Sequence, residues 1–218
     1  MSVADPDWDT ARGDWAELTP LVRRIVRADV DALARMRGAD RRVTAFGRLP
    51  TKALVARTVA LPNVPHRDEA GGRTFDVTMG AADLLAWLDG ESELRPARAD
   101  AGWLAPLPPV AGWLRVDQVP DAVVREVVRQ GAMAHADAAS LALGARAAEN
   151  LLDTPVLTVT GGGSSVELTN RTLSAVTSMG FLPRGGHVVV AVARGWTRVA
   201  APNGSVFAAR GGGGLGLL

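Results

Sequence analysis

The chain of 218 residues contains no cysteine, and Lys52 is its only lysine. Without cysteine, the protein can form no disulfide bond, thiolate nucleophile or cysteine-ligated zinc or iron–sulfur site. The three histidines, His66, His135 and His187, are widely separated, and no HExxH motif occurs. We therefore expect neither a metal site nor a cofactor.

Long apolar runs are also absent, and none approaches the roughly 20 residues of a membrane-spanning helix. The first seven residues are acidic and lack the apolar segment of a secretion signal. We therefore expect a cytoplasmic protein with no membrane partner.

Neither sign of charge is in clear excess, because the chain has 24 basic and 23 acidic residues and a net charge of +1. A dedicated nucleic-acid-binding protein usually carries a basic stripe, so we expect no nucleic-acid partner. The alternative is a weak contact through exposed helical arginines, with Asp31 and Glu126 diluting the positive charge. Those arginines are Arg23, Arg24, Arg27, Arg125 and Arg129.

What is present is an internal similarity. The segment 21–27, LVRRIVR, reappears as VVREVVR at 123–129, with the same residues at the second, third, sixth and seventh places. Each copy follows a proline suited to the first turn of a helix. Duplicated units of this kind bury one another's apolar faces.

The sequence predicts a mixed α/β (α+β) protein with two pseudo-repeats of helix–strand–strand–helix and a C-terminal antiparallel β-meander. The predicted divisions are an acidic N-terminal arm (1–17), a first α/β unit (18–102), a proline-rich connector (103–118), a second α/β unit with the meander (119–210) and a flexible glycine-rich tail (211–218).

In the first unit we expect a helix over 20–37, strands over 42–46, 54–61 and 74–77 with a loop at 62–72, and a helix over 81–88 capped by Thr78. In the second we expect a helix from 120 to 141, extending to 152 with a break near Gly144. A hairpin over 155–168 and a helix capped by Thr169 and ending at Gly180 follow. The meander strands are 187–193, 196–200 and 205–209.

Two residues interrupt the apolar stripes of the repeated helices. Asp29 falls among Val22, Ile25, Leu33 and Met36 on the first helix, and His135 takes the corresponding apolar side of the second. A buried carboxylate must be paired, hydrogen-bonded or protonated. The structural interpretation of Asp29 is a salt bridge to an arginine of the other unit, or exposure where the helix leaves the core, and the functional interpretation is a tuned acid or base facing a cavity. A satisfied core histidine is the structural alternative for His135.

No catalytic motif is recognisable, and no G-x-S-x-G element occurs. The first hypothesis is therefore a non-enzymatic binding or assembly module. It would form a homo-oligomer through the N-terminal arm, which carries Trp8, or through the C-terminal β edge. The alternative is an enzyme or small-molecule-binding protein with a cleft between the units, lined by Asp29 and His135 with Arg27 and Arg129 nearby.

Overall fold

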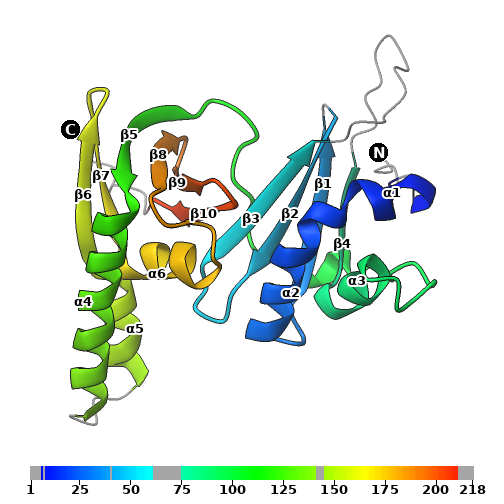
Figure 1. Ribbon diagram of the computed structural model, residues 1–218, viewed down its shortest axis with the longest axis horizontal. Helices are drawn as coiled ribbons and strands as arrows, with labels where there is room; N and C mark the ends of the chain where they lie inside the picture. Colours follow the sequence, from blue (N-terminus) through cyan, green and yellow to red (C-terminus); the bar gives the residue numbers. More distant parts are fainter. Residues whose placement is uncertain (1–5, 7, 40, 61–74, 141–144, 211–218) are drawn as a thin grey trace, which may run out of the picture. The chain divides into compact units, whose positions relative to one another are not determined.

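The computed structural model describes residues 6, 8–39, 41–60, 75–140 and 145–210. The chain divides into two compact units, Met1–Pro106 and Leu107–Leu218, each built from helices and antiparallel strands (Figure 1). The predicted loop 62–72, the break near Gly144 and the tail 211–218 lie outside the described residues.

The described part of the first unit contains four antiparallel strands in the order β4-β1-β2-β3. They are β1 (Leu33–Ala39), β2 (Arg42–Arg48), β3 (Leu54–Ala60) and β4 (Phe75–Gly80). Burial alternates along β1, where Ala34 and Met36 face the core and Arg35 and Arg37 face outward. This period of two is typical of a strand with one buried face.

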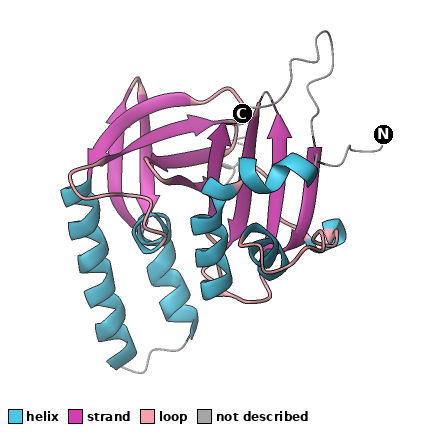
Figure 2. Ribbon diagram, turned by 45° about the vertical axis from the view of Figure 1, so that its right-hand side comes forward, coloured by secondary structure: helices cyan, strands magenta, loops and turns pink. Residues whose placement is uncertain are grey.

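Two helices, α2 (Thr19–Ala28) and α3 (Ala81–Leu88), pack side by side on the sheet of the first unit (Figure 2). Leu21, Val22 and Ile25 of α2 are fully buried. Ile25 packs directly over Gly47 of β2, where any side chain would collide with it. Burial of each such aliphatic side chain contributes about 1.5–3 kcal/mol.

An aromatic cluster holds the N-terminal arm on the first unit. The arm forms α1 (Trp8–Asp14) and the short helix η1 (Ala16–Leu18). The Trp8 ring lies 5.6 Å from Trp15 and 5.2 Å from Trp87. Arg12 covers Trp87 at 5.1 Å and forms an ion pair with Glu93. Trp8, which the sequence suggested for contact with a second copy, therefore packs inside its own unit.

The predicted helix over 20–37 is wrong in its second half. Helix α2 ends at Ala28, and Asp29 caps its C-terminus with extended backbone. The side chain of Asp29 accepts a hydrogen bond from the Asp31 amide at 3.0 Å, which forms a local turn. Aspartate competes in this way with helical hydrogen bonding, so the carboxylate marks the end of the helix rather than a buried charge.

The predicted cap of α3 is also wrong. Thr78 is a buried strand residue of β4, and the residue before α3 is Gly80, which provides no side-chain hydrogen bond. The Thr78 amide instead donates to Asp100 at 2.7 Å, in the short helix η2 (Asp100–Gly102). The helix itself, Ala81–Leu88, has the predicted bounds.

The second unit contains two groups of strands. Its meander strands are β8 (His187–Ala193), β9 (Trp196–Ala201) and β10 (Gly204–Ala209), and β5 (Leu114–Pro120) pairs with β8, giving the order β5-β8-β9-β10. A separate hairpin joins β6 (Pro155–Gly161) to β7 (Ser164–Thr169). The meander and the hairpin confirm the predictions, whereas β5 occupies part of the expected connector.

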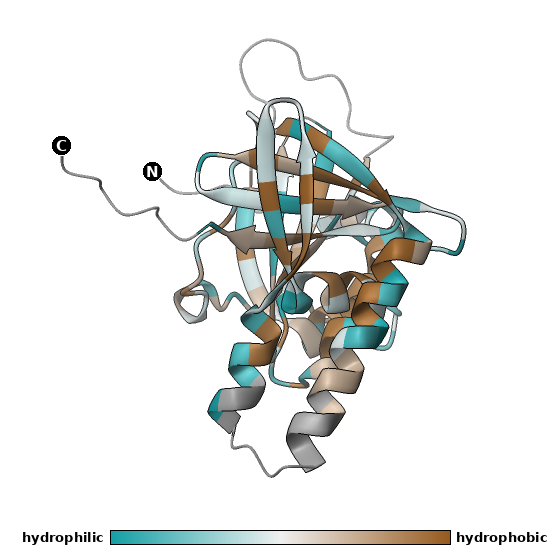
Figure 3. Ribbon diagram, turned by 90° about the vertical axis from the view of Figure 1, so that its left-hand side faces the viewer, coloured by the Kyte–Doolittle hydropathy of each residue, from teal (hydrophilic) through white to brown (hydrophobic). Residues whose placement is uncertain are grey.

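Three helices complete the second unit: α4 (Asp121–Ser140), α5 (Ala145–Asp153) and α6 (Asn170–Ser178). Hydrophobic and hydrophilic residues alternate in bands along α4 (Figure 3). Thr169 caps α6 as predicted, because its side chain accepts from the Thr172 amide. Helix α6 covers one face of the meander, where Val199 and Val206 are buried and the ring of Phe181 packs over Gly204.

The fold is thus mixed α+β, with strands between helices in both units and an antiparallel meander at the end. Among the described residues, the units differ in the number of strands between their helices, because four lie between α2 and α3 and two lie between α5 and α6. No helix of the described residues is long and apolar enough to cross a membrane.

Candidate functional site

The two residues predicted on the first helix are both exposed. Asp29 lies in the turn after α2 and Arg27 in its last turn. Asp29 is therefore exposed where the helix leaves the core, which was one of its structural interpretations, because the helix that would have placed it among Leu33 and Met36 ends at Ala28.

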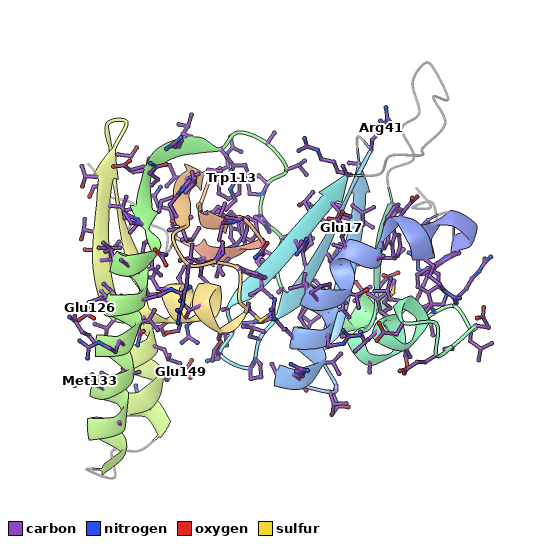
Figure 4. All side chains as sticks on the ribbon, in the orientation of Figure 1. Glu17, Arg41, Trp113, Glu126, Met133 and Glu149 are labelled. Atoms are coloured by element: carbon purple, nitrogen blue, oxygen red, sulfur yellow. The ribbon has the colours of Figure 1, made fainter. Side chains whose placement is uncertain are left out.

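The two residues predicted on the second helix lie on α4. Arg129 is engaged by its own helix: its Nη2 donates to Glu126 Oε1 at 2.6 Å, and its Nη1 lies 3.1 Å from the sulfur of Met133. Glu126 and Met133 project from α4 on the side turned away from α6 (Figure 4). Hydrogen bonds from Arg129 and Gln130 lower the pKa of Glu126 to about 2.

The side chain of His135 lies outside what the structure describes, and the approach of Asp29 to His135 stays a prediction. Across the described ranges, no group of three or more histidine and acidic side chains is arranged to hold a metal ion.

A different cluster stands out in the second unit, around Arg198 of β9. The Arg198 guanidinium lies 4.7 Å from the centre of the Trp113 ring, and Trp113 packs on Phe207 of β10 at 5.7 Å. The Trp113 indole donates to the carbonyl of Pro109 at 3.0 Å, which fixes the ring in place. The labelled Trp113 in Figure 4 lies against the meander.

Strand register places these residues on one face. Arg115, Ala191, Arg198 and Phe207 form a continuous row across β5, β8, β9 and β10. Cross-strand partners share a face, and neighbours along a strand lie on opposite faces. The row therefore lies on the face opposite α6. We call this surface, formed by Trp113, Arg115, Arg198 and Phe207, the arginine face.

The electrostatics of Arg198 differ from those of the other half-buried arginines. Arg35 and Arg171 each hydrogen-bond a carboxylate, Asp76 and Asp153 respectively, and these bonds raise the pKa of both guanidinium groups. Burial alone lowers the pKa of Arg198. Its Nε is buried without a hydrogen-bond partner among the described residues, and no acidic side chain there forms an ion pair with it.

A desolvated cation without a counter-charge is unfavourable unless an anion joins it. The planar fork of arginine suits a carboxylate or phosphate, which it can bind by two parallel hydrogen bonds. The arginine face contains neither a nucleophile nor a general base, so its chemistry is recognition rather than catalysis.

Arg198 was not among the residues that the sequence singled out. One signal was available: in the segment 196–200, WTRVA, Thr197 and Val199 alternate with Arg198, which places the cation on the face opposite the core side chains.

Two family models match the chain, one for each unit. Residues 8–106 match DUF8010 and residues 108–213 match DUF8185, both described as domains of unknown function. The boundary between them falls beside the division of the structure at Pro106 and Leu107. No curated protein matches the sequence.

Among solved structures, the chain is similar to bacterial DNA polymerase sliding clamps. The DNA polymerase III subunit β from Pseudomonas aeruginosa aligns with 94% of this chain at 11% identity and a TM-score of 0.59. The sliding clamp from Bacillus subtilis aligns with 93% at 12% identity and a TM-score of 0.56. The clamp from Caulobacter crescentus aligns with 94% at 14% identity and a TM-score of 0.52.

At such low identity the similarity concerns the fold alone. The chain covers 64% of the length of the Pseudomonas aeruginosa and Bacillus subtilis proteins. Its two units, matched by two domain families, therefore adopt an α+β fold like that of part of a sliding clamp.

Proposed function

We propose that the protein is a non-enzymatic binding or assembly module. The observation that carries this proposal is the fold similarity, which extends over 94% of the chain at a TM-score of 0.59 to a subunit of a sliding clamp. Fold does not determine function, so the proposal also depends on the surface that this chain presents.

The described side chains support binding. The arginine face combines an unpaired guanidinium with two aromatic rings, and aromatic and arginine residues are enriched at protein interfaces. The enzyme alternative needs Asp29 and His135 to meet, but Asp29 is exposed and engaged in the turn that ends α2. This weakens the catalytic alternative.

Self-association belongs to the proposal, but not through the arm. Trp8 already contacts Trp15 and Trp87, so the described part of the arm offers no free aromatic anchor. The predicted contact through the C-terminal β edge stays a prediction.

Sedimentation velocity of the full chain, from low to high micromolar concentration, tests assembly. We expect a reversible increase in the sedimentation coefficient with concentration. A Trp8→Ala variant should still associate, because Trp8 is an internal contact. A single monomeric species at every concentration would count against assembly.

A second candidate is a role on DNA, which the similarity to clamps of DNA polymerases favours. The fold similarity gives no support to the prediction that nucleic acid is not a partner. Of the five helical arginines named for such a contact, Arg23, Arg125 and Arg129 form ion pairs with Asp89, Asp121 and Glu126. Paired arginines contribute little to the positive potential that attracts phosphates.

Fluorescence anisotropy with labelled duplex DNA at two salt concentrations tests this second candidate. This candidate predicts binding at moderate salt, and no binding at either salt concentration would exclude it. Binding that weakens steeply as salt increases would show phosphate contacts and establish nucleic acid as a partner.

A further inference from the structure

We propose that the arginine face binds an acidic, partly apolar peptide segment of a partner protein, with Arg198 receiving a carboxylate of that segment. This inference rests on the proposed function and specifies the chemistry of the partner.

The first argument is the unsatisfied cation. Buried polar groups in folded proteins nearly always have hydrogen-bond partners, and exceptions need an explanation. Arg198 Nε is buried without a partner among the described residues, as is Nη1 of Arg171, but Arg171 and Arg35 bind carboxylates of their own unit and Arg198 binds none there. A carboxylate from another molecule would give Arg198 the partner that the other two arginines already have.

The second argument is the preformed geometry of the face. Trp113 covers the guanidinium at 4.7 Å and is itself fixed by Pro109 and by Phe207. This contact with the ring restricts the position of the guanidinium. A ligand would therefore meet an arginine that has already lost much of its side-chain freedom, which favours affinity.

The third argument identifies a peptide as the occupant. The face itself is partly apolar, because the half-buried rings of Trp113 and Phe207 lie on it beside Arg198. Aliphatic side chains of a peptide can bury this surface. Phosphate-rich nucleic acid would instead require a run of free cations, but Arg115 of the same row already donates to Gln118 at 3.0 Å.

The fourth argument is charge complementarity. Both charged residues of the cross-strand row, Arg115 and Arg198, are positive, and the row contains no carboxylate. Unlike the helices, where Glu126 and Asp121 neutralise the arginines beside them, this face has no acid in register with its cations. An acidic segment is therefore the complementary partner.

Isothermal titration calorimetry of the full chain tests the inference. The probe is an acetylated and amidated peptide of alternating glutamate and leucine, and its control carries glutamine in place of glutamate. We expect the acidic peptide to bind the wild-type chain and the glutamine peptide to bind about tenfold more weakly or not at all, as for loss of one charge-assisted contact.

The variant Arg198→Gln should lose about tenfold in affinity for the acidic peptide. The matched control is Arg194→Gln, in the exposed turn before β9, which should bind like wild type. The substitution Arg198→Gln leaves no acidic partner of Arg198 unpaired. It should therefore also keep the thermal unfolding midpoint of wild type. Arg198→Lys, which retains the charge and loses the fork, should bind with intermediate affinity.

Three results would overturn the inference: no binding of the acidic peptide to wild type, equal binding of the acidic and glutamine peptides, or unchanged binding by folded Arg198→Gln. A fall in the unfolding midpoint of Arg198→Gln together with absent peptide binding in wild type would assign Arg198 a structural role. Self-association in sedimentation would stand in that case, so failure of this inference is distinguishable from failure of the proposed function.

Discussion

Gly131 of α4 marks the closest approach between two helices of the second unit. A Cβ atom at this position would lie 2.6 Å from Oδ1 and 2.7 Å from Nδ2 of Asn170, at the start of α6. Asn170 is buried, and its Oδ1 accepts a hydrogen bond from Ser174. The absence of a side chain at Gly131 therefore lets α4 approach the buried polar side chain of Asn170.

The variant Gly131→Ala should therefore be destabilised. Alanine gains about 1 kcal/mol in helix propensity, but forced overlap in a packed site costs about 1–3 kcal/mol. We expect a net loss of about 1 kcal/mol in the free energy of unfolding, measured by chemical denaturation.

Gly13→Ala in α1 is the matched control, because no atom lies within 4 Å of a Cβ at that position. That variant should be as stable as wild type or more so. Adding Asn170→Ala to Gly131→Ala should recover part of the loss, and a double variant with no recovery would contradict the close-crossing account.

The pKa of a single side chain, Glu126, provides a second prediction at the residue scale. Its pKa is lowered to about 2 by Arg129 and Gln130 from an ordinary value of 4.5. A carboxylate with a depressed pKa stabilises the folded state above its unfolded pKa, and this contribution is lost as the pH falls from about 4.5 to about 2. NMR titration of Glu126 should show the low pKa in wild type and a rise toward 4.5 in Arg129→Ala.

The control for that titration is Arg125→Ala, because Arg125 pairs with Asp121 on the same helix. Its removal should leave the pKa of Glu126 unchanged. A normal pKa in the wild-type chain would mean that Arg129 is not held by Glu126 and is available to a ligand, as the sequence analysis suggested.

Asp29 shows why single residues mislead when an element boundary is misplaced. On a helix continued to Arg37, this carboxylate falls inside the apolar stripe and looks functional. In the structure the stripe consists of Leu21, Val22 and Ile25, and the later apolar residues belong to the alternating pattern of β1. The interruption of the apolar helical pattern at Asp29 indicated the turn that ends the helix.

At the scale of elements, Arg171 ties α5 to α6. Its Nε and Nη2 donate to the two carboxylate oxygens of Asp153 at 2.8 and 3.0 Å, and Nη2 also donates to Glu149 at 2.8 Å. The arginine side chain is 11% exposed, whereas the acids are 60% and 41% exposed. The bidentate geometry, rather than deep burial of the charges, makes this contact specific.

The variant Arg171→Leu should weaken the attachment of α5 to α6. We expect a loss of about 1–2 kcal/mol in the free energy of unfolding, since the acids regain water when the arginine is removed. Hydrogen exchange should accelerate in the amides of Ala145–Asp153. The matched control is Arg146→Leu on the exposed surface of α5, and equal exchange in both variants would exclude the tie.

Elements with strong local signals could be predicted from the sequence. The hairpin β6–β7, helix α6 after Thr169 and the meander all follow from turn glycines, a capping threonine and β-branched runs. Strand β1 could not, because Leu33–Ala39 also fits a helical period. Helix α1 was missed because its stability comes from Trp15 and Trp87, which the sequence does not place beside Trp8.

At the scale of the whole molecule, the sequence predicted the fold class but not the candidate site. The arginine face needs the register of β5, β8, β9 and β10, and it joins Trp113 to residues more than eighty positions later in the chain. Strand order of this kind depends on long-range pairing that no local pattern encodes. The two-unit organisation, in contrast, was visible in the repeated segments at 21–27 and 123–129.

Binding of a partner through the arginine face is the central proposal for this two-unit chain. Hydrogen–deuterium exchange of the full chain with and without the acidic glutamate–leucine peptide tests that claim most directly. We expect slower exchange in Trp113, β9 and β10 when the peptide is present, and unchanged exchange around Asp29. Protection around Asp29 with none in the meander, or no protection anywhere, would contradict the claim.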